Sequence, residues 1–294
     1  MQVHNGGRVL RPSYRRGGAL AVRCPAGLAG VFARAWGQRC PSPLARRNIT
    51  VALLAVADWR RWLDDAIALL SADEAARVQR RRMATDREAL AIAYALHRLL
   101  LGRVLGCEPQ DVPLHRDALG CPRLAGGIAH TSLSHADGAI ALAVTISGPV
   151  GVDVEPRSRA AVMAEIARSV CHPSEAAGFS MLDEAARSAA MLALWVRKEA
   201  LLKAAGIGLA VPMESFAAPE HHALRVPAVS AGAVQVRMLD AGAGCIAAVA
   251  GAPGAIVDCR WLRPVPAARV AVGDDLPLAP AAGPGRVTAG DHGQ

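Results

Sequence analysis

The apolar residues of this chain recur in two patterns, and each pattern predicts a type of secondary structure. Short apolar runs with β-branched residues predict strands at residues 49–56, 139–146, 150–155, 233–239, 245–250 and 255–262. Longer stretches rich in Ala and Leu predict helices over residues 86–105, 160–171 and 184–205. Ser71 with Glu74 three residues later is typical of a capping box, which marks the start of another helix. The mixture indicates an α+β fold.

The outer segments of the chain lack such patterns. Residues 1–47 mix Arg, Gly, Pro and Cys without periodicity, so we expect a poorly ordered Arg-rich extension there. Residues 264–294 are rich in Pro and Gly, which predicts a flexible tail. Between them, the order of the elements predicts two α+β halves, at residues 48–150 and 151–263, with a Gly- and Pro-rich loop over residues 106–127.

The formal net charge of +8 is carried by one end of the chain. Residues 1–47 hold nine Arg and no acidic residue, whereas residues 48–294 hold 24 basic and 25 acidic residues. Because this body is close to neutral, we expect no nucleic-acid ligand. No apolar run is long and uninterrupted enough to predict a membrane span. Seven cysteines without a C-x-x-C pair favour a reducing cytoplasm over a disulfide framework or a zinc knuckle.

Two acidic residues stand two positions apart on a predicted strand. Asp153 and Glu155 should point to the same face, because side chains alternate along a strand. Adjacent carboxylates repel one another unless a cation joins them, and a hard divalent ion such as Mg²⁺ suits that need. A strand end with a solvated acidic face is the alternative interpretation.

The lysines of the chain are confined to one helix. Only Lys198 and Lys203 are present, against 31 arginines, and both lie within six residues. Lysine is a compact, titratable point charge, so this clustering indicates a site that needs an ammonium group at a phosphate or a leaving group. Glu199 lies four residues before Lys203 and shares its helix face. An ordinary surface ion pair, or chance clustering, would give the same pattern.

One histidine stands beside a predicted strand. Ser134 and His135 come just before the strand at residue 139, where an imidazole can meet a phosphate, although such a histidine is more often structural. The chain has no Walker A motif, no G-x-G-x-x-G, no G-x-S-x-G and no H-E-x-x-H. Nucleotide-binding, hydrolase and zinc-protease classes with those motifs are therefore not indicated.

Taken together, three blocks of sequence resemble the 4′-phosphopantetheinyl transferases of the surfactin-synthetase-activating type. The blocks are Ser134-His135, residues 151–155 (GVDVE) and residues 195–203 (WVRKEALLK), in this order and at matching spacing. The resemblance covers residues 49–263. It implies a monomer with two similar halves related by a pseudo-two-fold axis and an active site in the cleft between them.

The resemblance also implies an activity. Such enzymes, of the holo-[acyl-carrier-protein] synthase type, move the phosphopantetheine arm of coenzyme A onto a serine of an apo carrier protein and release 3′,5′-ADP. The implied partners are carrier proteins of polyketide, non-ribosomal peptide or fatty acid synthases. Asp153, Glu155 and Glu199 are implied to hold Mg²⁺ on the pyrophosphate. Glu199 is implied to be the base for the carrier serine, and Lys203 to stabilise or protonate the leaving phosphate.

The resemblance further implies a set of coenzyme contacts. His135 would contact the 3′-phosphate, and Lys203 the diphosphate. Arg77 and Arg98 are implied as further phosphate or ribose-side contacts, and Lys198 would face the coenzyme or shape the cleft. Two positions where the family usually carries cations hold Glu74 and Cys121 here, so these contacts are less well matched than the acidic core.

Two other function classes stay open on the residues alone. A metal-dependent nuclease also clusters acids with a lysine, but usually as Glu-x-Lys on a strand, whereas Glu199 and Lys203 are spaced for a helix. A binding module with a basic N-terminal arm would use residues 1–47. Deletion of that segment is expected to abolish binding in the second case and to leave a transferase active.

Overall fold

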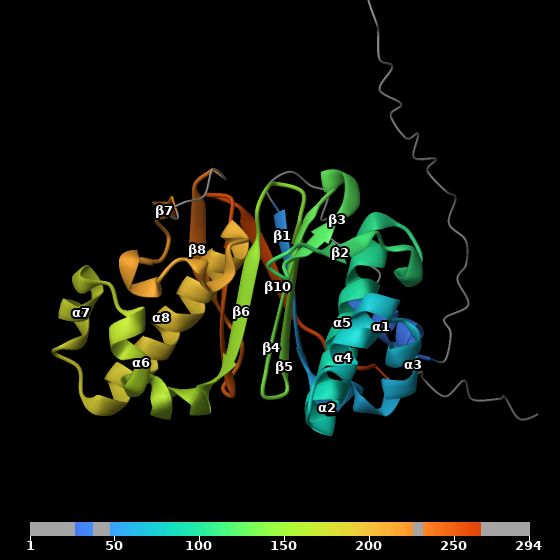
Figure 1. The fold of residues 1–294 in the computed structure, drawn as a ribbon, viewed down its shortest axis with the longest axis horizontal. Coiled ribbons are helices and arrows are strands. Elements are labelled where there is room, and N and C mark those ends of the chain that lie inside the picture. The colour runs from blue at the N-terminus through green and yellow to red at the C-terminus, as the bar shows by residue number, and fades with distance from the viewer. Residues whose placement is uncertain (1–26, 38–47, 226–231, 266–294) are drawn as a thin grey trace, which may run out of the picture.

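The computed structural model describes residues 27–37, 48–225 and 232–265, and it has the expected α+β character (Figure 1). The strands are β1 (Asn48–Ala55), β2 (Leu114–Arg116), β3 (Pro122–Leu124), β4 (His130–Ala136), β5 (Ala139–Thr145), β6 (Gly151–Pro156), β7 (Ala223–Leu224), β8 (Val234–Leu239), β9 (Cys245–Gly251) and β10 (Ile256–Trp261). The α-helices are α1 (Leu28–Trp36), α2 (Val56–Trp59), α3 (Leu63–Ala68), α4 (Ala72–Gln79), α5 (Ala84–Leu105), α6 (Met163–Val170), α7 (Pro173–Phe179) and α8 (Glu184–Ala205). Short 3₁₀ turns are η1 (Arg60–Trp62), η2 (Pro109–Asp111), η3 (Ala125–Gly127), η4 (Arg157–Val162), η5 (Gly208–Ala210) and η6 (Met213–Ser215).

Two four-stranded sheets form the centre of the molecule. One has the strand order β10-β1-β5-β4 and the other β6-β9-β8-β7, while β2 and β3 form a separate hairpin. The sheets lie next to each other, with α1 and α3–α5 on the outer side of the first and α6–α8 on the outer side of the second (Figure 1). Strands β4 and β5 contact β6, so the first sheet meets the second along β6.

Three clusters of buried apolar side chains hold these layers together. One fills the space between the first sheet and its helices, a second does so for the other sheet, and a third joins the two sheets. The third cluster contains Val51 and Ala141 from the first sheet and Val152 and Val249 from the second. Burial of this apolar surface is the main favourable contribution to folding, and it fixes β6 against the first sheet.

The long helices α5 and α8 are matched in length and in how they end. Each spans 22 residues and is followed by a glycine, Gly106 or Gly206, in the left-handed conformation with a φ of 70°. Glycine is favoured there because a Cβ would be strained at positive φ. The expected capping box at α4 is present, since Ser71 Oγ accepts from Glu74 N and the Glu74 carboxylate accepts from Ser71 N. Within the described residues, no helix combines the length and apolar character that a membrane span requires.

The prediction of a poorly ordered extension over residues 1–47 is wrong for its central part. Residues 28–36 form α1, and its apolar face packs against α5. Phe32 and Trp36 are 1% and 2% exposed, and Asp65 accepts a hydrogen bond from Leu28 N at 2.8 Å. The sequence did not predict this helix because its apolar periodicity extends over only nine residues and is flanked by Arg, Gly and Pro. Residues 1–26 and 38–47, and residues 266–294 of the expected tail, lie outside the described residues.

Three further expectations need correction. Strand β10 follows the second sheet in sequence, yet it pairs in parallel with β1 of the first, so the segment 151–263 is not a separate half. The loop expected over residues 106–127 contains the β2–β3 hairpin. Ser134 and His135, expected before a strand, lie within β4. Tertiary pairing, which periodicity does not encode, decides all three.

Candidate active site

The site is built where helix α8 lies directly on strand β6. Gly151 makes this approach possible, because a Cβ there would collide with Ala200 O and Ala204 N of the helix backbone. The contact brings one face of α8 over the carboxylates that follow Gly151 on the strand. A glycine at the start of β6 thus determines how close the two halves of the site come.

Asp153 and Glu155 lie on the same face of β6, as their spacing predicts. They are 3% and 6% exposed, so the alternative of a solvated acidic strand end is wrong. Burial of two carboxylates is costly without cationic partners or hydrogen bonds. The structure supplies a cation for each: Lys203 for Asp153 and Arg159 for Glu155.

Lys203, Asp153 and Ser134 form a closed group of three polar side chains. Lys203 Nζ lies 2.6 Å from Asp153 Oδ1 and 2.8 Å from Ser134 Oγ. Ser134 Oγ donates to the same Asp153 Oδ1 at 2.7 Å. Three elements, α8, β6 and β4, therefore meet at a single carboxylate oxygen.

Glu155 is held by a residue that sequence reasoning did not single out. Arg159 Nη1 donates to Glu155 Oε1 at 2.7 Å, and its guanidinium lies 5.3 Å from the centre of the Trp195 ring. Trp195, the first residue of the α8 block, thus supports the acidic pair indirectly. In the sequence, Arg159 could have been found only from its position four residues after Glu155. Such spacing predicts an ion pair within a helix, but here the strand ends at Pro156 between the two residues, so the sequence did not predict the pair.

Two glutamates of the site, Glu155 and Glu199, have pKa values raised above their ordinary range. Burial raises the pKa of Glu155, and neighbouring Asp153 raises it further, against the lowering effect of Arg159 and Lys203. Burial likewise raises the pKa of Glu199; Lys203 opposes this, while Asp153 and Glu155 add to it. Glu199 therefore lies within electrostatic reach of both β6 carboxylates, and an added cation would favour ionisation of the group.

A cavity of about 690 Å³ opens at this place. His135, Glu155 and Arg159 line it, together with Arg81 and Asp86 from the segment that begins α5. Burial lowers the pKa of His135, and the cations Arg81 and Lys203 lower it further. Three arginines of the lining can donate hydrogen bonds to a phosphate group, and four carboxylates line the same cavity: Arg60, Arg81 and Arg159, with Asp86, Glu88, Asp137 and Glu155. The cavity thus places arginine side chains beside the carboxylate of Glu155.

The donor set can be compared with what Mg²⁺ requires. Asp153 Oδ2 and Glu155 Oε2 are buried and have no hydrogen-bond partner, so two carboxylate oxygens are free to ligate. Mg²⁺ takes one or two carboxylates and completes its shell with water and substrate phosphate, so this pair fits it. Within the described part of the chain, however, no group of three or more His, Cys, Asp or Glu is assembled as a metal site. Glu199 as a third ligand stays a prediction.

The structure does not place Lys198 in the site. Its side chain is 0% exposed, and Nζ donates to the carbonyls of Val170, Met213 and Phe216 at 2.7–2.8 Å. Glu175 Oε2 lies 2.7 Å away. Lys198 is a structural ammonium that ties α6, α7 and η6 to α8, and the expected contact with a coenzyme does not fit this burial.

The two predicted arginine contacts also differ from one another. Arg98 is 3% exposed, pairs with Glu74 and donates to Pro109 O, so it is engaged inside the protein and does not fit a ligand contact. Glu74, at a position where a cation was expected, is the acid that pairs with it. Arg77 instead lines a separate cavity of about 240 Å³ with Arg80 and Arg116. It remains available to an anion.

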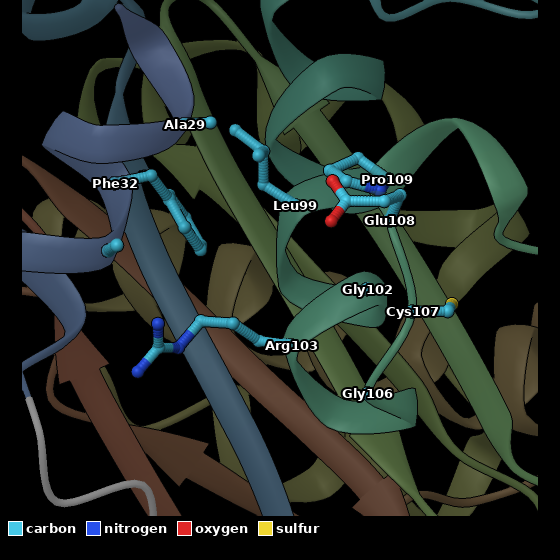
Figure 2. A pocket seen from close by; sticks show the side chains of 10 residues that line it. Ala29, Phe32, Leu99, Gly102, Arg103, Gly106, Cys107, Glu108 and Pro109 are labelled. Carbon is cyan, nitrogen blue, oxygen red and sulfur yellow. The ribbon is translucent and has the colours of Figure 1, made fainter. Parts of the chain in front are cut away.

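Other cavities lack chemistry of this kind. One of about 440 Å³ lies between α1 and α5 and is lined mostly by apolar side chains and glycines (Figure 2). Arg103 and Glu108 are its charged residues, and Arg103 also donates to Gly37 O. Another of about 700 Å³ lies among α6, α7 and α8. Neither contains a residue of the acidic site.

Comparison with known proteins bears on the same segment. The sequence model of the 4′-phosphopantetheinyl transferase superfamily matches residues 149–245, which contain Asp153, Glu155, Glu199 and Lys203. Over 174 residues the chain is 29% identical to 4′-phosphopantetheinyl transferase HetI of Nostoc sp., covering 55% of this chain and 73% of the relative. Over 154 residues it is 27% identical to a 4′-phosphopantetheinyl transferase of Bacillus subtilis, covering 52% and 67%.

A third relative matches a smaller part of the chain. The chain is 28% identical over 121 residues to 4′-phosphopantetheinyl transferase gsp of Aneurinibacillus migulanus, covering 41% of this chain and 49% of that protein. The chain thus spans between about half and three quarters of the length of these relatives. The similarity supports the family resemblance drawn from the three sequence blocks.

Proposed function

We propose that this protein transfers the 4′-phosphopantetheine arm of coenzyme A to a serine hydroxyl of an apo carrier protein. In this reaction the serine oxygen bonds to the phosphorus that carries the pantetheine arm. The pyrophosphate bond breaks, and 3′,5′-ADP leaves. The observation that carries the proposal is the meeting of Asp153, Ser134 and Lys203 beside Glu155, at a cavity that arginine side chains also line.

Each residue has a role that follows from its surroundings. A serine hydroxyl is a weak nucleophile at neutral pH and needs a base within hydrogen-bond reach. Glu199 is the proposed base, since burial and nearby acids raise its pKa and so increase its basicity. Lys203, whose side chain is 27% exposed, is the proposed group that stabilises charge on the leaving phosphate.

Mg²⁺ is the proposed metal, and when bound it would neutralise charge on the pyrophosphate oxygens. Asp153 and Glu155 would hold it through their free oxygens, with Glu199 as the proposed third ligand. His135 and Arg77 are the proposed contacts to the phosphates of the coenzyme. We omit Lys198 and Arg98 from this set because both are buried and paired.

The finer assignment is to the surfactin-synthetase-activating type, a monomer acting in the cytoplasm on carriers of polyketide, non-ribosomal peptide or fatty acid synthases. Its support is the order of the three sequence blocks. The nuclease alternative is not favoured, since Glu199 and Lys203 project from a helix over β6 and the chain resembles transferases.

The test is intact-mass spectrometry of an apo carrier protein incubated with this protein, coenzyme A and Mg²⁺. We expect a gain of one phosphopantetheine group that is absent when EDTA is present. A panel of acyl and peptidyl carriers, with a serine-to-alanine carrier as the control, separates partner choice from activity. No gain on any carrier, by a protein that binds coenzyme A, would contradict the proposed reaction.

A further inference from the structure

Strand β4 turns two serine hydroxyls toward β6, and they do different things. Ser132 Oγ accepts a hydrogen bond from Val152 N at 3.1 Å, which links a side chain of β4 to the backbone of β6. Ser134, two residues on and on the same face, instead donates to the side chain of Asp153 at 2.7 Å. One serine therefore joins the strands, while the other contacts the acidic site.

The hydroxyl of Ser134 makes two contacts that no apolar side chain can make. A hydroxyl has one donor and two acceptor sites, so it can donate to Asp153 Oδ1 and accept from Lys203 Nζ at once. Ser134 is 6% exposed and Asp153 is 3% exposed, so water does not readily replace these bonds. The carboxylate of Asp153 is thereby held from one side only.

The two oxygens of the Asp153 carboxylate differ in their contacts. Asp153 Oδ1 receives both Ser134 and Lys203, while Oδ2 is buried without a partner. We infer that Ser134 is a positioning residue: its hydroxyl fixes the rotation of the Asp153 carboxylate and the place of the Lys203 ammonium, so that Oδ2 is presented for the metal. The inference deepens the proposed function and rests on it for the identity of the metal.

The test compares substitutions at the two serines. Ser134→Ala and the near-isosteric Ser134→Cys remove the strong hydroxyl bonds, Ser134→Thr keeps a hydroxyl, and Ser132→Ala is the matched control on the same strand face. Thermal unfolding of each variant shows whether it is folded. Ser134→Cys keeps the proposal testable if Ser134→Ala does not fold.

The first readout does not need activity. The chain has two lysines, and Lys198 is fully buried, so acetylation by N-hydroxysuccinimide acetate, mapped by peptide mass, reports the side chain of Lys203. We expect Ser134→Ala and Ser134→Cys to raise the acetylation rate of Lys203 about fivefold, the factor that one hydrogen bond represents. Ser132→Ala should leave the rate unchanged, and Ser134→Thr should restore it.

The second readout is the dependence of transfer on metal. We expect Ser134→Ala to raise the Mg²⁺ concentration for half-maximal rate about fivefold, with the KM for coenzyme A unchanged. Equal acetylation and equal Mg²⁺ midpoints in Ser134→Ala and Ser132→Ala would overturn the inference. A change in the KM for coenzyme A alone would make Ser134 a coenzyme contact and overturn it too. Absence of transfer by the unmodified protein would refute the proposed function, and acetylation would still decide the positioning role.

Discussion

The helices α5 and α8 have the same length and the same type of C-terminus, but their polar side chains have different surroundings. Each has 22 residues, covers the outer face of a four-stranded sheet and ends at a left-handed glycine. On α5 the buried polar side chains contact other protein side chains: His97 Nε2 bonds to Thr131 Oγ1 and Arg98 pairs with Glu74. On α8 the turn that contains Glu199 and Lys203 faces the carboxylates of β6. The comparison indicates that the candidate site depends on the carboxylates of the strand beneath α8 and not on the length or the ends of the helix.

The contrast is repeated within α8, between its two lysines. Lys198 is enclosed by three carbonyls and Glu175, whereas Lys203 reaches Asp153 and Ser134 and keeps 27% of its side chain exposed. The clustering of the two lysines therefore pointed to the candidate site for Lys203 but not for Lys198. An ammonium suits a cage of carbonyl oxygens as well as a phosphate, since it donates in three directions.

The largest effect is expected at the base. Glu199→Gln keeps the size of the side chain but removes its basicity, so transfer should fall about 10³-fold, within the range that general bases contribute. The initial rate of carrier modification by intact mass measures it. Glu184→Gln, an exposed position on the same helix, is the control and should keep the normal rate. Near-normal turnover of Glu199→Gln would contradict the assignment of the base.

The two lysines should separate cleanly in stability. Lys198→Met leaves Glu175 without its buried cation and three carbonyls without a donor, so the free energy of unfolding should drop by about 3–5 kcal/mol. Lys203→Met should change it less, because that side chain is partly exposed and Ser134 still donates to Asp153, while it removes most transfer activity. Urea unfolding of both variants is the measurement. A stable Lys198→Met with lost activity would instead return Lys198 to the active site.

The outer side of α5 can be weakened through α1. Phe32 stacks on Trp36 with ring centres 6.1 Å apart and lies 5.9 Å from Trp59, so Phe32→Ala should cost about 3 kcal/mol of unfolding free energy. Arg34→Ala on the same helix is the control and should stay within about 0.5 kcal/mol. If thermal unfolding of the two variants coincides, α1 does not contribute to the core. Deletion of residues 1–47 removes this helix and is no longer expected to be harmless.

The smallest effect is a pH dependence at His97. Complete burial, with help from Arg116 and Arg98, lowers the pKa of His97 to about 3, below the value of about 6.5 in an unfolded chain. The unfolded state then binds the extra proton, so stability falls as pH drops below about 6.5. His97 should account for about 2 kcal/mol between pH 6.5 and 4.5. Chemical denaturation of His97→Gln across this range should show a shallower loss; parallel curves would refute the claim.

Periodicity was sufficient for the long elements and for the acidic pair. Alternation along β6 predicted that Asp153 and Glu155 share a face, and the spacing of Glu199 and Lys203 predicted a shared helix face. Both follow from repeats of two and 3.6 residues that any local window contains. The capping box at Ser71 was predicted for the same reason, since its hydrogen bonds join residues three apart.

What could not be predicted depends on contacts far apart in sequence. The pairing of Arg98 with Glu74, and the cage around Lys198, join residues from different elements whose approach is set by tertiary packing. A cation at the surface and one in a cage look alike in sequence. Ser134 was read as part of a motif, but its bond to Asp153 became visible only when β4 was seen beside β6.

The return of β10 to the first sheet bears on how the chain is made. Asn48 pairs with Ile256, so during synthesis the edge of β1 stays unpaired until a strand 208 residues further along the chain has been made. Such long-range pairing is slow to form, and an unpaired strand edge invites association with other chains until it closes. Truncation just before β10 would keep every proposed active-site residue, yet it would leave this edge open and favour aggregation.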